Sequence, residues 1–456
     1  MAGTENVKQL SSCNDARAMI VRAKEEGVET VWDRLAAQEP QCGYCALGVS
    51  CRNCSMGPCR VDPFGEGPQK GVCGADADII VARNLGRTIA AGASAHSDHG
   101  RDILEVFGEL AEGTTSGYSL RDETKLKALA GEYGIETGDR AKEEIALDLA
   151  RAVYAEFGKQ EGFVQFTRRA PEKRVALWQS QGIDPRGIDR EIVEIMHRTH
   201  IGVDNDPVNL ILQGLKASIA DGWGGSAIAT ELSDVLFGTP TPVRSQANLG
   251  VLKADQVNII VHGHEPVLSE MIVAASNDPE LVTLAEKVGA KGINVGGICC
   301  TGNEIIMRHG IPIVGNFLQQ ELAVITGAVE AMIVDVQCIM PSLGPLSECF
   351  HTKFISTSPK AKFPGAIHME FSEEKAFDIA KQIVQAAVEN YSFRTPEKVL
   401  IPEDKTECMV GFSAEAIIKA LGGTLDPLLD AIKSGAIKGI AGVVGCNNPK
   451  IKHDEG

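Results

Sequence analysis

Apolar residues recur at helical spacing through the first half of the chain. The spacing predicts a helical lead-in over residues 15–38, broken once at Gly27, and few strand-like alternations occur before Pro240. Further stretches with helical spacing are 75–85, 102–110, 142–157, 189–200 and 208–220. We therefore predict a mainly helical domain over residues 1–243.

The pattern changes after Gly250 to short apolar runs that alternate with helical segments. The apolar runs are 257–261, 293–298, 311–314, 332–336 and 354–357. Alternating strands and helices specify a parallel sheet with helices on both faces, so residues 244–390 are predicted to form a Rossmann-like α/β domain.

A third segment, residues 391–456, begins with the apolar run 399–401. It continues through a helix over 413–421 to a Gly- and Val-rich strand over 437–444. One or two strands cannot complete a core, so we expect the start of a second Rossmann-like domain, cut off partway. The predicted fold class is α/β, with a helical N-terminal domain and Rossmann-like domains of which the last is incomplete.

Charge and composition narrow the choice of partners and compartment. The net charge of −17 argues against nucleic acid and anionic membranes, which select for basic faces, and remains compatible with a small redox carrier. No run of about twenty apolar residues occurs and no apolar leader follows Met1, so we predict a cytoplasmic protein without a membrane span. The phosphate-loop pattern Gly-x4-Gly-Lys-Ser/Thr is absent.

Six of the 13 cysteines lie between Cys42 and Cys73. A disulfide framework belongs to short secreted domains, and structural zinc prefers paired Cys-x2-Cys units. Here Cys51-x2-Cys54-x4-Cys59 places three thiols on one tight loop, and Cys73 follows from further along. This spacing favours an iron–sulfur cluster over zinc.

One four-cysteine set leaves Cys42 and Cys45 over. Two thiolates do not complete a cluster, but a second copy of the chain supplies two more. A cluster on a twofold axis needs the same residues from each subunit, so the spacing predicts a homodimer with an intersubunit cluster.

Candidate metal ligands follow the predicted strands, where ligands bind in open parallel sheets. They are His262-Gly-His264, Cys299-Cys300, Cys338 and, after the last predicted strand, Cys446. A single buried cysteine is often only a small apolar residue, whereas several successive strand ends with such side chains indicate a metal site.

In the helical half, His96 and His99 share a helix face. From the residues alone they are metal ligands, a proton relay or solvated polar residues. Asp221 precedes glycines, which most simply marks a helix end and a turn.

Taken together, these residues resemble the anaerobic nickel–iron carbon monoxide dehydrogenases. The matching runs are 51–68, 72–75, 95–99, 195–199, 236–240, 261–264, 297–304, 307–310 and 445–448. The resemblance spans the whole chain and implies a homodimer with a helical domain followed by Rossmann-like domains.

The resemblance also implies three kinds of cluster. A 4Fe-4S cluster would be held by Cys51, Cys54, Cys59 and Cys73. The upstream pair would hold an intersubunit cluster. One family pattern has its second cysteine where this chain has Ser50, so Cys45 is the nearby substitute and the choice between 4Fe-4S and 2Fe-2S stays open.

For the nickel–iron–sulfur active cluster, the resemblance gives four matching ligands: His264, Cys300, Cys338 and Cys446. Mixed imidazole and thiolate ligation suits nickel and iron. Cys299 is expected to face away from this site, because successive side chains of an extended backbone point to opposite faces. The roles of Cys299, Cys349 and Cys408 stay open.

By the same resemblance, His96 and His99 begin a proton path and Asp221 lies near the reacting metals. The family's next histidine on that helix is Asp102 here. The implied reaction is the reversible oxidation of carbon monoxide by water to carbon dioxide, with two electrons passed through the clusters to a ferredoxin-like acceptor. The sequence leaves open whether an acetyl-CoA synthase is a further partner.

Two other classes of protein compete with this interpretation. One is the hybrid-cluster proteins, which are hydroxylamine reductases, although their loop spacing fits less well. The other is a non-catalytic iron–sulfur protein for electron transfer or sensing. The family continues beyond the position of His453 with two more cysteine ligands and a lysine, so we expect a truncated chain that holds iron but little nickel.

Overall fold

A computed structural model describes residues 7–115 and 117–451. The chain divides into two compact units. The α/β unit comprises Met1–Gln38, Thr115–Gly117 and Phe237–Gly456, and the helical unit comprises Glu39–Thr114 and Tyr118–Leu236. Within the described residues, no helix has both the length and the apolar character needed to cross a lipid bilayer.

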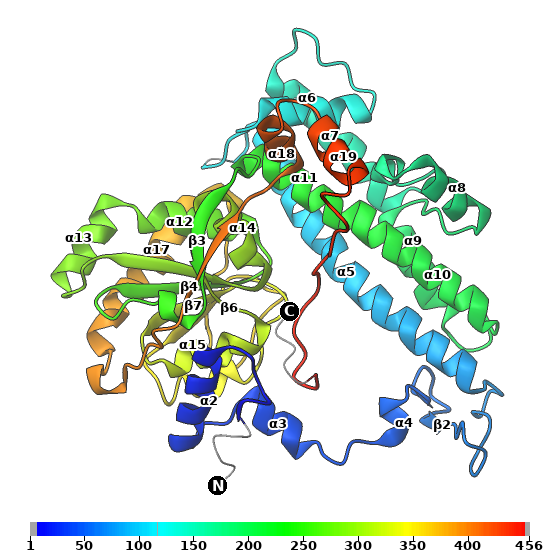
Figure 1. Ribbon diagram of the computed structural model, residues 1–456, viewed down its shortest axis with the longest axis horizontal. Helices are drawn as coiled ribbons and strands as arrows, with labels where there is room; N and C mark the ends of the chain where they lie inside the picture. The colour runs from blue at the N-terminus through cyan, green and yellow to red at the C-terminus, as the bar shows by residue number, and fades with distance from the viewer. Residues whose placement is uncertain (1–6, 116, 452–456) are drawn as a thin grey trace. The chain divides into compact units, whose positions relative to one another are not determined.

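The helical unit is organised around one long helix, α5 (Ala77–Glu112), which packs along α10 (Pro207–Ala220) (Figure 1). The Asp76 carboxylate caps its first turn by accepting from Ile79 N, and Gly113 ends it with a left-handed φ of 72°. The two stretches predicted at 75–85 and 102–110 are therefore one helix. The other helices of this unit are α4 (Gly43–Ala46), α6 (Glu123–Glu132), α7 (Lys142–Gly158), α8 (Glu172–Ser180), α9 (Ile188–Arg198) and α11 (Ser226–Phe237).

The α/β unit contains an eight-stranded sheet with the order β10-β3-β6-β5-β4-β7-β8-β9. All neighbouring pairs are parallel except β10 and β3. The strands are β3 (Val243–Ala247), β4 (Val257–Gly263), β5 (Ile293–Ile298), β6 (Ile313–Gly315), β7 (Val329–Val334), β8 (Lys353–Ser356), β9 (Ile367–His368) and β10 (Thr406–Val410). The predicted α/β class with a largely parallel sheet is confirmed.

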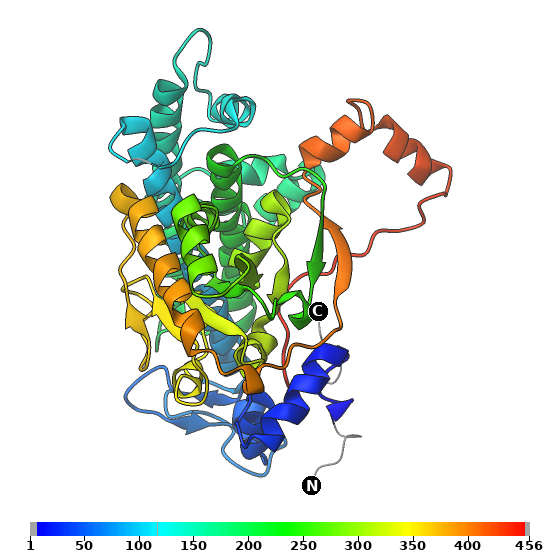
Figure 2. The ribbon, with the colours of Figure 1, turned by 90° about the vertical axis from the view of Figure 1, so that its left-hand side faces the viewer.

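Helices cover both faces of this sheet. On one face α12 (Pro266–Ser276) packs against α14 (Cys299–His309) and α17 (Ala376–Asn390), and Figure 2 shows α17 in orange beside α12 in green. On the other face α15 (Gln320–Ile325) packs against α2 (Asn14–Glu25) and α16 (Leu343–Leu346). The chain moves outward from β4 through β5 to β6 and then returns to β7, so the strand order reverses between β4 and β7. Open parallel sheets bind ligands at such a switch point.

The structure divides the chain differently from the predicted ranges 1–243, 244–390 and 391–456. The segment that carries α2 belongs to the α/β unit, because the apolar face of α2 packs against α15 in the hydrophobic core of that unit. Its Asp15 carboxylate also accepts from Leu249 N at 2.9 Å. The β10 strand, predicted to lie in a second domain, joins the same sheet as an antiparallel edge strand.

The prediction of two strands near the end of the chain is wrong. Residues 399–401 and 437–444 do not form strands, and Cys446 therefore does not follow one. A strand needs a ladder of backbone hydrogen bonds with a neighbouring strand, and among the described residues neither segment pairs with one; Leu400 N makes a single bond to Thr326 O at 2.8 Å. Val443 and Val444 are consequently exposed in the red ribbon that follows α19 (Asp426–Lys433) in Figure 1.

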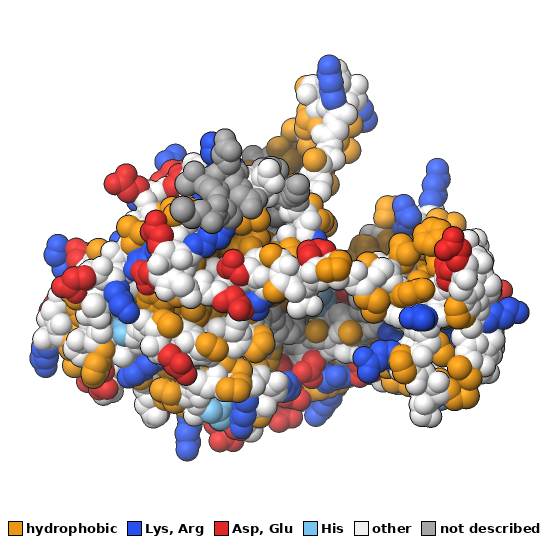
Figure 3. Space-filling view, turned by 90° about the horizontal axis from the view of Figure 1, so that it is seen from below, with side chains coloured by type: hydrophobic (Ala, Val, Ile, Leu, Met, Phe, Trp, Pro, Cys, Tyr) orange, Lys and Arg blue, Asp and Glu red, His pale blue; other side chains and the backbone are white. Residues whose placement is uncertain are grey.

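The surface carries both signs of charge in spite of the net charge of −17. Figure 3 shows acidic side chains in red and basic side chains in blue, interspersed with apolar side chains over the face drawn there. Exposed apolar atoms at this level are normal for a folded protein.

Candidate active site and cysteine loop

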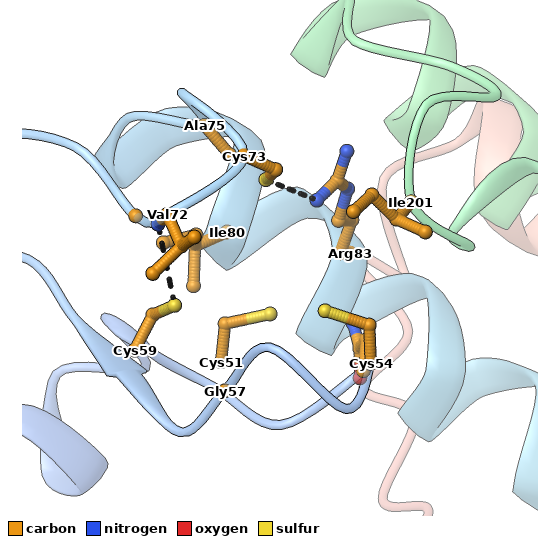
Figure 4. A pocket seen from close by; sticks show the side chains of 12 residues that line it. Cys51, Cys54, Gly57, Cys59, Val72, Cys73, Ala75, Ile80, Arg83 and Ile201 are labelled. Atoms are coloured by element: carbon orange, nitrogen blue, oxygen red, sulfur yellow. Dashed lines mark hydrogen bonds between the residues drawn. The ribbon is translucent and has the colours of Figure 1, made fainter.

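The cysteine loop of the helical unit surrounds a cavity. Its walls include Cys51, Cys54, Cys59 and Cys73, together with Ile80 and Arg83 from α5 and Ile201 (Figure 4). The short strands β1 (Ser50–Cys51) and β2 (Cys59–Arg60) pair antiparallel and bring Cys51 opposite Cys59. The structure thus brings together the four cysteines that the spacing grouped.

Two hydrogen bonds reach sulfur atoms of this set. Val72 N donates to Cys59 Sγ at 3.4 Å, and Arg83 Nη1 donates to Cys73 Sγ at 3.9 Å. The pKa of the Cys73 thiol is lowered, first by a hydrogen bond from the backbone of Ala75 and then by the nearby guanidinium of Arg83. Hydrogen bonds and positive charge favour a thiolate, which is the form that binds metal.

The upstream pair lies on the surface next to this loop. Cys42 precedes α4 and Cys45 lies within it, and both side chains are exposed. Hydrogen bonds from Cys45 lower the pKa of Cys42. Ser50 Oγ lies 3.5 Å from Cys45 Sγ, so Cys45 is adjacent to the position at which one family pattern has its second cysteine.

A second group of thiols lies in the α/β unit at the carboxyl ends of the strands. One cavity is lined by Cys299, Cys300, Cys338 and Cys446, with Asn303, Phe317 and Asn447 among its other walls. Burial, with the neighbouring Cys338 and Cys446 adding to it, raises the pKa of Cys300 to about 12. Thiols of this kind keep their protons until a metal ion replaces them.

The expectation for Cys299 is wrong. The backbone at Cys299 is not extended but has a left-handed φ of 61° at the start of α14, and its side chain lines the same cavity as that of Cys300. A hydrogen bond with Cys338, followed by burial, raises the pKa of Cys299. Both neighbours therefore face the site.

His264 is buried and does not line this cavity, but its loop is fixed by Asp335. The Asp335 carboxylate accepts from His264 N at 2.6 Å, from Glu265 N at 3.0 Å and from the Thr301 hydroxyl at 2.8 Å, and Val336 N also donates to it. Burial raises the pKa of Asp335 to about 7, against the effect of these hydrogen bonds. One buried carboxyl therefore joins the loops after β4 and β7 to the start of α14.

The turn that carries Cys338 has a strained backbone, and the side chain of Gln320 holds it through hydrogen bonds. Gln337 and Cys338 both have left-handed φ values, of 65° and 58°. Gln320 Nε2 donates to Cys338 O at 3.1 Å, and its Oε1 accepts from Met340 N at 2.9 Å. His262 Nε2 lies 3.1 Å from the same Oε1, and burial lowers the pKa of His262 to about 4.

His96 and Asp221 meet within the helical unit. His96 Nδ1 lies 2.7 Å from Asp221 Oδ1. The prediction that Asp221 marks a helix end is wrong. Asp221 begins a π-helical turn, Asp221–Gly225, that continues α10 into α11. Gly225 packs directly on the backbone of His96, where a Cβ would come within 2.9 Å, so only glycine allows this approach. Such π turns often occur at functional sites.

His99 lies one turn beyond His96 on α5. Sequence reasoning missed Asp335, Gln320 and Arg83. For two of them the sequence holds a feature that could have indicated a buried role. Asp335 directly follows an apolar strand, and Arg83 falls three residues after Ile80 on the apolar face of a predicted helix. Gln320 had no such feature, because its role depends on a distant turn.

Each of the two cavities is lined by four cysteines. Within residues 7–115 and 117–451, no three His, Cys, Asp or Glu side chains converge closely enough to hold one metal ion. The thiols instead surround space, as the ligands of a group of several metal atoms do. Fold and site together define an α/β protein built to hold thiolate-bound metal clusters.

Comparison with known proteins identifies the family. A model of the "Prismane/CO dehydrogenase family" matches residues 49–456. Carbon monoxide dehydrogenase 1 of Methanosarcina mazei is 66% identical over 441 residues, which cover 97% of this chain and 70% of that protein. The chain belongs to the Prismane/CO dehydrogenase family.

Solved structures agree. A Ni-free structure of carbon monoxide dehydrogenase from Thermococcus sp. AM4 matches with a TM-score of 0.96 and 57% identity, covering 98% of this chain and 71% of that one. A chain of an acetyl-CoA synthase/carbon monoxide dehydrogenase structure, described as having NiZn[Fe4S4] and NiNi[Fe4S4] clusters in its alpha subunits, matches with a TM-score of 0.93 and 41% identity, covering 99% of this chain and 68% of that one. These comparisons confirm the resemblance and the prediction of a carbon monoxide dehydrogenase-type oxidoreductase of the nickel–iron–sulfur class.

Proposed function

We propose that this protein oxidises carbon monoxide with water at the cavity of the α/β unit and passes two electrons through the cysteine loop to a ferredoxin-like acceptor. The observation that carries the proposal is the gathering of Cys300, Cys338 and Cys446 around one cavity next to the switch point of the sheet. The nickel–iron–sulfur cluster, when bound, supplies the metal atoms at which carbon monoxide and water become carbon dioxide, two protons and two electrons.

The ligands proposed for this cluster are His264, Cys300, Cys338 and Cys446. Three line the cavity, and His264 belongs to the loop that Asp335 fixes. Thiolate and imidazole are the ligand types that nickel and iron prefer. Cys299 is a further candidate, since it lines the same cavity.

His96 is proposed to take up a proton as a general base. If its Nδ1 donates to the Asp221 carboxylate 2.7 Å away, the ring is held in one tautomer and Nε2 is left to accept a proton. The π turn holds Asp221 in this place, and His99 on the next turn of α5 would receive the proton from His96.

The electrons are proposed to leave through a 4Fe-4S cluster held by Cys51, Cys54, Cys59 and Cys73. A second cluster, held by Cys42 and Cys45 from each of two subunits, would link a homodimer. The exposure of both thiols and the contact between Ser50 and Cys45 support this arrangement. Free thiols on the surface fit the reducing cytoplasm.

The test is metal analysis combined with a turnover assay on protein purified without oxygen. In place of the chain with iron but little nickel expected from the sequence alone, this proposal predicts nickel and iron together, with reduction of a viologen dye that depends on carbon monoxide. Cys300→Ala should abolish this reduction and lower the nickel content, whereas Cys408→Ala, in the edge strand β10, should leave both unchanged. Iron without nickel, with reduction of hydroxylamine, would contradict the proposal and favour a hybrid-cluster protein. Co-purification would show whether an acetyl-CoA synthase is a partner.

A further inference from the structure

Arg83 is a buried positive charge without a carboxylate partner. Its side chain is 1% exposed, and among the described residues no acidic group forms an ion pair with it. Nη2 donates to Asn205 Oδ1 at 2.9 Å and Nη1 to Cys73 Sγ at 3.9 Å. Nε is buried and has no hydrogen-bond partner within the described part of the chain.

A charge this deeply buried is costly unless a nearby negative charge offsets it. Arg83 is part of the wall of the cysteine-lined cavity, so an occupant of that cavity is placed to supply this negative charge. Figure 4 shows the Arg83 and Cys73 side chains directed toward each other at one side of that cavity. Four thiolates around an iron–sulfur cluster carry the net negative charge that the guanidinium needs.

We propose that Arg83 is the counter-ion of the cluster held by Cys51, Cys54, Cys59 and Cys73, and that its charge raises the reduction potential of that cluster. The proposal rests on the proposed function for its assignment of a cluster to these cysteines. Reduction adds one electron beside a fixed positive charge, so the guanidinium stabilises the reduced form more than the oxidised form. Burial leaves this interaction poorly screened, and hydrogen bonds to sulfur act in the same direction.

Asn205 is the positioning residue in this arrangement. Its Oδ1 accepts from Nη2 and so directs the opposite side of the guanidinium toward Cys73. Arginine suits the task because its planar fork donates in two directions at once and keeps its charge when buried.

The test measures the midpoint potential of this cluster by a redox titration followed by electron paramagnetic resonance, with the iron content as a check on cluster assembly. Arg83→Gln, which removes the charge and keeps a donor, should shift the potential to a more negative value. Arg83→Lys, which keeps the charge, should retain most of the wild-type value. The matched control is Arg52→Gln, which removes the same charge from an exposed position in the cysteine loop, where water screens it, and should leave the potential unchanged.

Asn205→Asp provides a variant in which Arg83 stays in place. The new carboxylate would offset the guanidinium charge, so the potential should fall, though less than in Arg83→Gln. If Arg83→Gln loses its iron, its potential cannot be measured, and the midpoint potential of Asn205→Asp relative to the wild type then tests the proposal. An unchanged potential in Arg83→Gln or in an iron-loaded Asn205→Asp would overturn the role of Arg83 and leave the proposed function standing. An unchanged iron content in Cys51→Ser would instead overturn the proposed function, because no cluster would then be held by these cysteines.

Discussion

Replacing Asp335 tests whether one buried carboxyl holds the metal-binding loops together. The conservative change is Asp335→Asn, which keeps the size of the side chain and one of its two oxygens. In the wild type both oxygens accept from backbone N–H groups: Oδ1 from His264 and Val336, and Oδ2 from Glu265. Both oxygens accept these bonds whether the carboxyl is ionised or protonated.

The magnitude follows from the bonds that asparagine cannot make. With its oxygen in the place of Oδ1, its amide nitrogen replaces Oδ2 and faces Glu265 N, so this half-buried donor loses the acceptor that Oδ2 provides. The Thr301 hydroxyl adapts, because it can rotate to accept instead. An unsatisfied donor costs about 1–3 kcal/mol when it is fully buried; the lower end applies to this half-buried N–H, so opening of these loops should become about 5-fold more frequent.

Hydrogen exchange followed by mass spectrometry measures this opening directly. In metal-free protein, peptides that cover residues 263–268, 299–302 and 335–338 should exchange faster in the variant by the factor given above. Protein loaded with metal should in addition retain less nickel, because three loops that carry candidate ligands lose a common anchor.

The matched control is Glu330→Gln at the opposite end of the same strand, β7. Glu330 is fully buried and accepts from Asn258 N at 2.6 Å and from Arg394 Nη2 at 2.7 Å. This variant should weaken the amino end of the sheet and leave the nickel content unchanged. Equal loss of nickel in both variants, or wild-type exchange in Asp335→Asn, would refute the role assigned to Asp335.

Three further outcomes are expected. Cys42→Ser should remove one cluster of iron per dimer and leave the cluster at Cys51 intact in its electron paramagnetic resonance signal; loss of both clusters would mean that the cysteines are divided differently. His96→Ala should slow carbon monoxide oxidation about 10²- to 10⁴-fold, as loss of a general base does, with metal content unchanged; loss of nickel would instead make it a ligand. Gly225→Ala should destabilise the helical unit by about 1–3 kcal/mol through overpacking on His96 and lower turnover by displacing Asp221. Its control is Gly222→Ala in the same π turn, where a Cβ meets nothing within 4 Å and thermal unfolding should hardly change.

Local spacing predicted the features that depend on neighbours in the chain. The run 293–298 was expected as a strand and forms β5, because a short, largely apolar run suits a parallel strand covered on both faces. The four cysteines between Cys51 and Cys73 could be grouped because a short loop can bring three of them together unaided. The cysteines after β5 and β7 could be placed at one edge because parallel strands end on the same side.

What the sequence could not determine is which surface each apolar face covers. The face of α2 was visible in its spacing, but only the folded chain shows that it packs on the α/β unit, with Asp15 bonded to Leu249 N. In the same way β10 was expected in another domain and joins the existing sheet. The hydrophobic effect is nondirectional, so a pattern fixes burial without naming the partner.

The sequence by itself determined the cysteine spacing, the alternation of strands and helices, and hence the class of site. The tertiary structure decided the polar contacts that hold the site: Asp335 across three loops, Gln320 on a strained turn, and Arg83 against Cys73. Each contact joins residues through a hydrogen bond of fixed direction and length. Residues distant in sequence satisfy those limits only after the whole unit has folded. Even Arg83, ten residues from Cys73, is oriented by a hydrogen bond to the more distant Asn205.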